Sequence, residues 1–215
     1  MTEEQHNLGA LSSEEQNLLQ KIMSIGVGNA AADLGAVIDI HVQLSVPTIT
    51  VIPSVELLNH IRKNVSDAHE ISIIEQNFWS KIQGTAMLIF TTGAGRALLS
   101  LMGAIGKEQV FESDPMHTLE KEMLMEIGNI LTGACVGKVA ELLGDFVIYS
   151  PPRVLIGAIE SANLSKMVFD QKNFATILQT TFNFEEQDFK GCLFLIINHE
   201  SSGWLRQALK NFSGQ

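Results

Sequence analysis

Apolar residues recur along the chain at two spacings, which predict helices and strands in turn. Within 119–134 they recur every three or four positions, as on one face of a helix. This apolar stripe is expected to face the core, and it consists of Leu119, Met123, Ile127, Ile130 and Ala134.

Both long helices of the predicted pattern carry a signal at their first residues. Ser12 and Glu15 have the spacing of a capping box, in which each side chain bonds the backbone of the other residue. Asp114 can cap the second long helix, with Pro115 at the first helical position, where the missing N–H of proline costs little.

Strands and shorter helices follow each long helix. Strands are predicted at about 39–52, which is rich in Val, Ile and Thr, and at about 145–159. The runs "MLIF" (87–90) and "LFLIIN" (193–198) are apolar enough for central strands of a sheet. Shorter helices are expected at about 54–63, 94–104, 161–170 and 202–211.

The two series of elements look like one unit written twice. Residue pairs in two separate segments share a single offset of 105 positions without a gap, which indicates an internal duplication. The matched pairs are Ile25 and Ile130, Gly28 and Gly133, and Pro47 and Pro152 (130 − 25, 133 − 28, 152 − 47).

Later segments agree, with Gly84 opposite Gly191 at an offset of 107 (191 − 84), which fits two extra residues in a loop. The chain is therefore expected to be a single domain of two repeats, about 12–104 and about 115–211, joined around 105–115. Each half would have a marginal core by itself. The expected fold class is α/β of the α+β type. Its helices would pack on an antiparallel or mixed sheet, with the repeats related by a pseudo-two-fold axis.

Composition and charge exclude several classes of protein. With 46% apolar and 18% charged residues and a mean hydropathy of +0.17, the chain of 215 residues is globular. A formal net charge of −10 argues against nucleic acid, or an anionic membrane surface, as a main ligand.

No apolar run approaches 18 residues and the start is polar and acidic, so neither a membrane span nor a signal peptide is expected. Cys135 and Cys192 lack metal-ligand spacing and the histidines are scattered, so we expect buried thiols of a reduced cytoplasmic protein and no metal site.

A polar stripe on the second long helix carries the candidate chemistry. At about 100° per residue, Glu122, Glu126 and Asn129 fall within about 60° of each other. Asparagine is a poor mid-helix residue, because its side chain competes for nearby backbone groups. Gly133 continues the same flank without a side chain, so another protein could approach the helix closely there.

Two interpretations of this stripe are open on spacing alone. A Glu followed by an Asn is common on a solvated helix face. The equivalent positions of the first repeat hold Asn17, Lys21 and Ser24, although the apolar scaffold matches between the repeats. Either these positions drift freely, or one repeat kept a site that the other lost.

The stripe and its surroundings resemble a known signature. "EIGN" (126–129), "TGA" shortly after it, and Pro152, 22 intervening residues beyond Asn129, are similar to the pattern of the CheC/CheX/FliY family. That pattern is Asp or Ser, three residues, Glu, two residues, Asn, 22 residues and Pro. "SIGVGNAAADLG" (24–35) is similar to the text that opens the family's repeats. The Asp or Ser position is Glu122 here, and the length of the chain resembles CheC.

This resemblance implies a phosphatase of bacterial chemotaxis that acts on phosphorylated CheY, a response regulator of two-component signalling. It implies that Asn129 positions the attacking water and that Glu126 docks on the active-site lysine of the regulator. Glu122, Gly133 and Pro152 would contribute to the partner-binding surface, with Pro152 shaping the loop under the helix. The regulator would supply Mg²⁺ and the phosphoaspartate, so this chain is expected to need no cofactor or metal of its own. CheD is implied as a second candidate partner.

A non-catalytic adaptor of the same fold is the alternative. It would bind a receiver domain, CheD or flagellar switch components, as a resemblance to the middle domain of FliM suggests. The retained pair Glu126 and Asn129 favours catalysis, because a scaffold has no need of that combination. An enzyme acting on a small molecule is a third class, which no nucleophile, base and orienting group in the sequence supports. The oligomeric state stays open.

Overall fold

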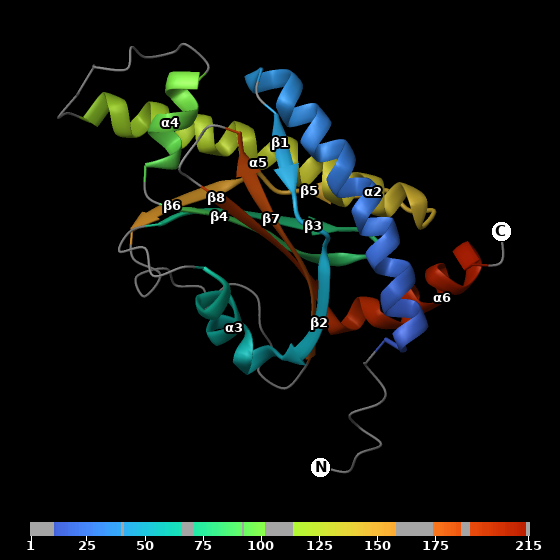
Figure 1. The fold of residues 1–215 in the computed structure, drawn as a ribbon. Helices are drawn as coiled ribbons and strands as arrows, with labels where there is room; N and C mark the ends of the chain where they lie inside the picture. Colours follow the sequence, from blue (N-terminus) through green and yellow to red (C-terminus); the bar gives the residue numbers. More distant parts are fainter. Residues whose placement is uncertain are drawn as a thin grey trace.

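Two long helices lie side by side over one face of a curved sheet in the computed structural model, and a short helix lies on the other face (Figure 1). The structure describes residues 11–39, 41–65, 71–91, 93–101, 114–157, 174–185 and 190–213. The helices are α2 (Ser13–Ile38), α3 (Leu57–Asn64), α4 (Ala94–Leu101), α5 (Asp114–Leu142) and α6 (Ser202–Ser213), with 3-10 turns η1 (Ser54–Glu56) and η3 (His199–Ser201). The strands are β1 (Val42–Leu44), β2 (Thr48–Pro53), β3 (Ile71–Trp79), β4 (Gln83–Thr91), β5 (Ile148–Tyr149), β6 (Arg153–Gly157), β7 (Phe174–Phe184) and β8 (Lys190–Asn198).

Within the described residues the sheet has eight strands in the order β1-β7-β8-β4-β3-β5, with β2 beside β7 and β6 beside β3. Every pairing is antiparallel. The strands predicted to be central, β4 and β8, are paired with each other in the middle of the sheet. The predicted fold class, helices packed on an antiparallel sheet, is therefore confirmed.

The register of the sheet follows a two-fold relation. Strands β4 and β8 have nine residues each and start 107 positions apart (190 − 83). In their pairing Met87 lies opposite Phe194, which is its own counterpart at that offset (194 − 87). Strands β1 to β4 belong to the first segment of the chain, about 12–104, and β5 to β8 belong to the second, about 115–211. Around the central pair, β1 and β2 of the first segment pair with β7 of the second. In the same way, β5 and β6 of the second segment pair with β3 of the first. Strands from the two segments are thus interleaved in one sheet.

The strands predicted at 39–52 and 145–159 are each interrupted, which corrects the sequence-based boundaries. Each break contains a proline at its last position, Pro47 in 45–47 and Pro152 in 150–152. Proline has no N–H to donate to a ladder, so strand pairing is interrupted there. Ser150 replaces part of the missing ladder: its N–H donates to Asn77 O (2.9 Å), and its Oγ accepts from Asn77 N–H (3.0 Å). The helix before the first strand also continues to Ile38, so that strand begins later than predicted.

Helix α2 begins as predicted, with a capping box. Ser12 Oγ accepts from Glu15 N–H (3.2 Å), and Glu15 Oε2 accepts from Ser12 N–H (2.7 Å). Helix α5 begins at Asp114, but the side chains of Asp114 and Pro115 lie outside the described residues, so their predicted capping roles stay predictions. The predicted helix at 161–170, the end of the helix at 94–104 and most of the junction around 105–115 lie outside them as well.

The predicted apolar stripe of α5 is confirmed in part, since Met123, Ile130 and Ala134 pack against the core around the buried Ile127. Leu119 is 42% exposed, and of the five predicted residues only Ile127 is fully buried. Helix α5 packs against both the sheet and α2, so its buried face is broad and centred on a neighbouring stripe. That buried stripe consists of Leu124, Ile127, Leu131, Cys135 and Val139.

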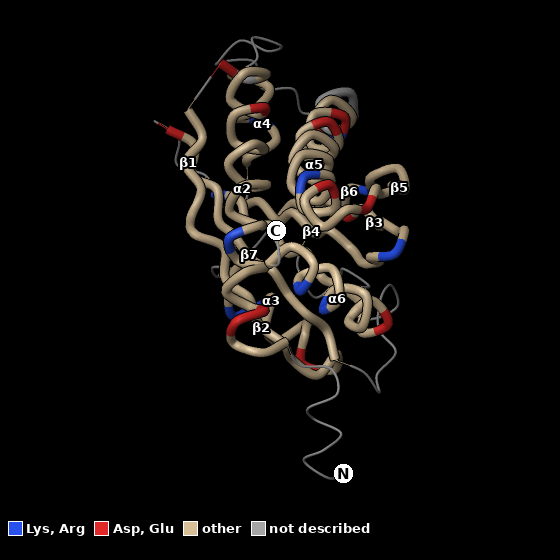
Figure 2. The backbone as a smooth tube through the Cα atoms, turned by 90° about the vertical axis from the view of Figure 1, so that its right-hand side faces the viewer, with Lys and Arg blue, Asp and Glu red and all other residues tan. Residues whose placement is uncertain are grey.

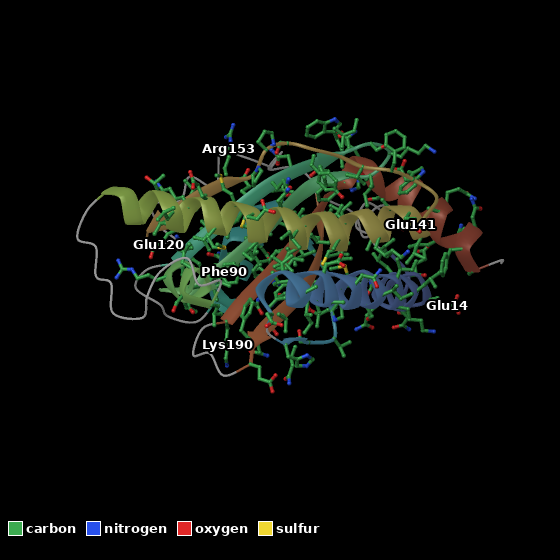
Figure 3. The ribbon with its side chains drawn as sticks, turned by 90° about the horizontal axis from the view of Figure 1, so that it is seen from above. Glu14, Phe90, Glu120, Glu141, Arg153 and Lys190 are labelled. Atoms are coloured by element: carbon green, nitrogen blue, oxygen red, sulfur yellow. The ribbon has the colours of Figure 1, made fainter. Side chains whose placement is uncertain are left out.

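Helices α2 and α5 run antiparallel: Glu14 of α2 and Glu141 of α5 lie at one end of the pair, and Glu120 lies at the other (Figure 3). A Cβ added to Gly26 would stand 2.9 Å from the backbone oxygen of Cys135, so the absence of a side chain lets the helices touch. Cys135 and Cys192 are buried free thiols, as predicted.

One described segment, Thr118–Leu142 within α5, is long and apolar enough to cross a membrane by length and composition. Half of its most apolar window is buried inside the protein. The core helix of a soluble protein passes the same test, so this segment is weak evidence for a membrane span.

Candidate functional site

Helix α5 presents the predicted polar stripe on an outer flank. Glu122, Glu126 and Asn129 are all exposed, and acidic positions recur along this helix (Figure 2). Gly133, one turn further, is half-buried, and a Cβ built there would meet nothing within 4 Å. The flank therefore has open space where the sequence analysis expected a close approach by another protein. Pro152 lies in the loop between β5 and β6.

The exposed residue Asn129 is anchored by a buried one. Gln76 on β3 is 2% exposed, and its Nε2 donates to Asn129 Oδ1 at 3.1 Å. The same Nε2 donates to the backbone oxygen of Ser150 at 2.9 Å. One buried amide thus joins helix α5, strand β3 and the loop that ends at Pro152.

A glycine brings helix and strand close enough for this contact. A Cβ added to Gly128 would lie 2.5 Å from Ile74 Cγ2 and 3.2 Å from Ile74 Cβ. Ile74 faces α5 from β3, two residues before Gln76. Any side chain at position 128 would force the helix away from the strand, and the distance between Gln76 and Asn129 would grow with it.

Tyr149 on β5 supports the next turn of the helix. Its hydroxyl lies 3.5 Å from the backbone oxygen of Gly133, a long hydrogen bond, and 3.3 Å from a Cβ built on Gly137. Burial raises the pKa of Tyr149 to about 12, with a smaller contribution from Cys135. The hydroxyl therefore stays protonated around neutral pH and keeps its hydrogen for donation to the helix.

Glu126 carries a carboxylate that the described residues leave available. No basic side chain among them lies within ion-pairing distance of it, whereas Glu120 on the same helix pairs with Arg96 (3.1 Å). An exposed, unpaired carboxylate one turn from an anchored amide can bind a cationic group of another molecule without first breaking a contact in this chain.

The equivalent place in the first segment is built differently. Ser24 stands where α5 has Asn129, and its Oγ donates to Gln20 O of its own helix (2.8 Å). Thr180 on β7 stands where β3 has Gln76, and its Oγ1 donates to the backbone oxygen of Ser45 (2.8 Å). The bond from strand to loop is thus present in both segments, but only Gln76 is long enough to reach the helix.

Gln76 is the site residue that the sequence analysis missed. A signal was present, because "EQN" at 75–77 interrupts a largely apolar strand, and a buried polar residue is informative. Helical periodicity around Asn129 could not find a partner 53 positions away on a strand.

Metal-binding potential is low in the part of the chain that the structure describes. No group of three or more His, Cys, Asp or Glu side chains gathers there in a way that could hold an ion. The arrangement can offer a carboxylate, an oriented amide and an open helix flank to a second molecule.

Comparisons with known proteins place this arrangement in a fold. No family model matches the sequence. Among solved structures, Thermotoga maritima FliY is similar over 94% of this chain and 99% of its own, with a TM-score of 0.71 and 17% identity. FliM in a FliM–SpeE complex from H. pylori is similar over 95% and 98%, with a TM-score of 0.64 and 11% identity.

A third similar solved structure is a complex of two proteins. It is a CheX–CheY–BeF3–Mg²⁺ complex from Borrelia burgdorferi, similar over 80% of this chain and 96% of the matched one, with a TM-score of 0.55 and 13% identity. Each of these likenesses extends over 80% or more of this chain. The chain has the fold shared by the CheC/CheX/FliY family, as the resemblance around Glu126 and Asn129 indicated.

Proposed function

We propose that the protein hydrolyses the aspartyl phosphate of a CheY-type response regulator in the cytoplasm. Asn129 positions the attacking water, and Glu126 docks on the regulator's active-site lysine. The observation that carries the proposal is the exposed Asn129 amide, anchored from below by Gln76 and accompanied one turn away by the unpaired Glu126. A relative of the same fold forms a complex with CheY, which supports a receiver domain as the partner.

The chemistry requires orientation more than reactivity. An acyl phosphate is an activated bond, so the task is to hold one water in line with the phosphorus, opposite the leaving carboxylate. An amide suits this task because it offers both a donor and an acceptor and carries no charge that would repel phosphate. The water oxygen bonds to phosphorus, the bond from phosphorus to the aspartyl oxygen breaks, and aspartate leaves as a carboxylate. The water protons end on the phosphate and in solvent.

The other residues of the proposed site contact the partner or shape the surface that it meets. Glu126 forms a charge-assisted contact with the regulator's lysine and thereby sets the helix against the phosphate. Glu122 adds a rim contact, Gly133 lets the partner's backbone approach, and Pro152 holds the shape of the loop beside Asn129. The Mg²⁺ belongs to the receiver domain, and this chain contributes no cofactor.

The test is the decay of a phosphorylated CheY-type receiver with Mg²⁺, alone and with this protein. Wild type should accelerate the decay, and Asn129→Ala should lower the rate by about 100-fold or more, because a positioned water is lost. Ser24→Ala, the same truncation at the equivalent place on α2, is the matched control and should keep full activity. Equal rates for wild type and Asn129→Ala would contradict the proposed role.

A non-catalytic adaptor is the second candidate, favoured by the similarity to FliM structures, one of which contains a partner protein. Such an adaptor would bind a receiver domain, CheD or components of the flagellar switch. The same experiment separates the two functions. Measurable binding of the receiver without faster decay would assign the adaptor, with Glu126 and Asn129 as contact residues.

A further inference from the structure

We infer that Gln76 is a positioning residue for the proposed phosphatase, because it fixes which end of the Asn129 amide faces the partner. This inference rests on the proposed function and adds to it a residue from outside the helical motif. Gln76 lies on β3 and never reaches the surface, so it acts through Asn129 and not on the substrate.

The hydrogen bonds set the orientation of both amides. The backbone oxygen of Ser150 can only accept, so the end of Gln76 that faces it must be the NH₂ group. The second N–H of the same nitrogen meets Asn129, and the atom it meets must be an acceptor, Oδ1. The Nδ2 of Asn129 is left for the outer side, where it can donate to a water or to a phosphate oxygen.

The cost of this arrangement argues against a purely structural role. Both N–H groups of Gln76 are used, but its Oε1 is buried and has no partner among the described residues. A buried unpartnered carbonyl destabilises a fold. A residue needed only to tie the loop to the sheet would avoid that penalty.

Thr180 makes the equivalent contact, between a strand of the second segment and a loop of the first, without leaving its hydroxyl unpartnered. At the equivalent place of β7 it ties Ser45 to the sheet with a short hydroxyl, which has hydrogen-bond partners in Ser45 O and Ser45 Oγ. The place with Ser24 on its helix therefore has the short residue. The place with Asn129 has the long one, whose extra length serves the contact with Asn129.

The test uses this internal comparison. Gln76→Thr keeps a hydroxyl that can bond Ser150 O, as Thr180 bonds Ser45 O, and removes only the contact with Asn129. We expect kcat for receiver dephosphorylation to fall about 10-fold, because the amide is no longer held in one orientation. KM should stay within about twofold, because Glu126 and the docking surface are unchanged.

A double variant separates positioning from general damage. In the Asn129→Ala background, Gln76→Thr should cause no further loss, because there is no amide left to orient. Gln76→Met, of similar length but without hydrogen-bonding groups, is the second variant, and its kcat should fall at least as far. The side-chain NH₂ signals of Asn129 in an NMR spectrum, identified by their absence in Asn129→Ala, should shift in Gln76→Thr.

Several results would overturn the inference. Wild-type kcat in Gln76→Thr and Gln76→Met, with wild type itself active, would exclude Gln76 and leave the proposed function standing. Equal fold-losses from Gln76→Thr with and without Asn129 would indicate structural damage. Unchanged NH₂ signals would show that Gln76 does not hold the amide. If wild type fails to accelerate decay of any receiver, the proposed function fails and the inference falls with it.

Discussion

Asn129 is an exposed residue of α5 whose amide oxygen is held by a buried side chain, Gln76. A free asparagine on a helix would sample several rotamers and bond its own backbone. The contact with Gln76 removes that freedom before any partner arrives. An amide that is already oriented loses less entropy when it binds a water and a phosphate.

Glu126 should act in binding, separately from the orientation of the water. Glu126→Lys replaces the carboxylate by a cation that faces the regulator's lysine. Loss of a charge-assisted contact is worth about 1.5–3 kcal/mol, so KM should rise about 10- to 100-fold. The kcat at saturating regulator should change little, because Asn129 and Gln76 are untouched. Steady-state rates over a range of regulator concentrations measure both quantities.

Glu122→Lys is the matched control for this variant, since it makes the same charge change one turn earlier on the same flank. It should raise KM less than Glu126→Lys does. Equal effects at both positions would mean that overall charge steers the partner and that Glu126 has no specific contact.

At the residue scale, the sequence predicted the exposed members of the site and missed the buried one. Glu122, Glu126 and Asn129 share a flank because helical geometry is regular, and one segment of sequence suffices to place them. The contact of Asn129 with Gln76 depends on how closely α5 sits on β3. That distance is set by Gly128 against Ile74, which no periodicity within the helix reveals.

At the scale of the element, the glycines of α5 face different neighbours and so have different roles. Gly128 packs closely against Ile74 of the sheet, and Gly137 lies next to the Tyr149 hydroxyl. Gly133 faces open space, so nothing within the described residues requires a glycine there. Since glycine is a poor helix former, its presence at 133 fits a surface reserved for another molecule.

This difference predicts opposite outcomes for two alanine substitutions. Gly133→Ala should raise the free energy of unfolding by about 0.5–1 kcal/mol through helix propensity, yet weaken binding of the regulator. Gly128→Ala should lower stability by about 1–3 kcal/mol, because its Cβ overlaps the stiff side chain of Ile74. Chemical denaturation and regulator binding measure the two effects.

Gly28→Ala on α2 is the control, because a Cβ there also meets nothing within 4 Å. It should stabilise the protein like Gly133→Ala and leave regulator binding unchanged. If Gly133→Ala binds the regulator as well as Gly28→Ala does, the flank at 133 is not a docking surface.

Element types were predictable from sequence, and their boundaries and rotation were not. The apolar period of α5 identified a helix, but the side that became buried was decided by two neighbours at once, the sheet and α2. Leu119 shows the consequence, since it fits the stripe and still lies 42% exposed. The strand breaks at Pro47 and Pro152 follow from a proline signal that was visible in the sequence.

At the scale of the whole molecule, one buried acid should make stability depend on pH. Glu75 on β3 is 2% exposed, and one of its carboxylate oxygens has no partner among the described residues. Burial raises the pKa of Glu75, and the charge of Arg153 on the paired strand opposes this shift in part. The folded state therefore holds the proton more tightly than the unfolded state does.

The sign of the effect follows from that difference. The protonated form stabilises the fold at low pH, and stability is lost as pH rises from about 4.5, where an ordinary Glu ionises, through the higher folded pKa. Glu75→Gln should therefore be more stable than wild type at neutral pH, and the difference should shrink on acidification. Denaturation curves at several pH values measure this.

Glu200→Gln, at an exposed position, is the control and should follow the wild-type profile. If Glu75→Gln also follows the wild-type profile at every pH, Glu75 is hydrated in solution, and burial does not perturb it.

The interleaving of strands was beyond the reach of sequence alone. Constant offsets predicted a duplication, but nothing in those offsets says that β1 and β2 pair with β7 of the other segment. Pairing across the two segments is a long-range choice made by the whole sheet. The central contact of Met87 with Phe194 becomes recognisable as a symmetry element only once that choice is known.

The contact between Gln76 and Asn129 crosses this interleaving, since β3 belongs to the first segment and α5 to the second. The proposed site at 122–152 therefore depends on a strand position that lies outside its motif. The first segment has Lys21 and Ser24 where α5 has Glu126 and Asn129, yet it supplies Gln76 to the site of the second segment. Neither half of the chain could therefore carry the proposed site by itself, because Gln76 belongs to one half and Asn129 to the other.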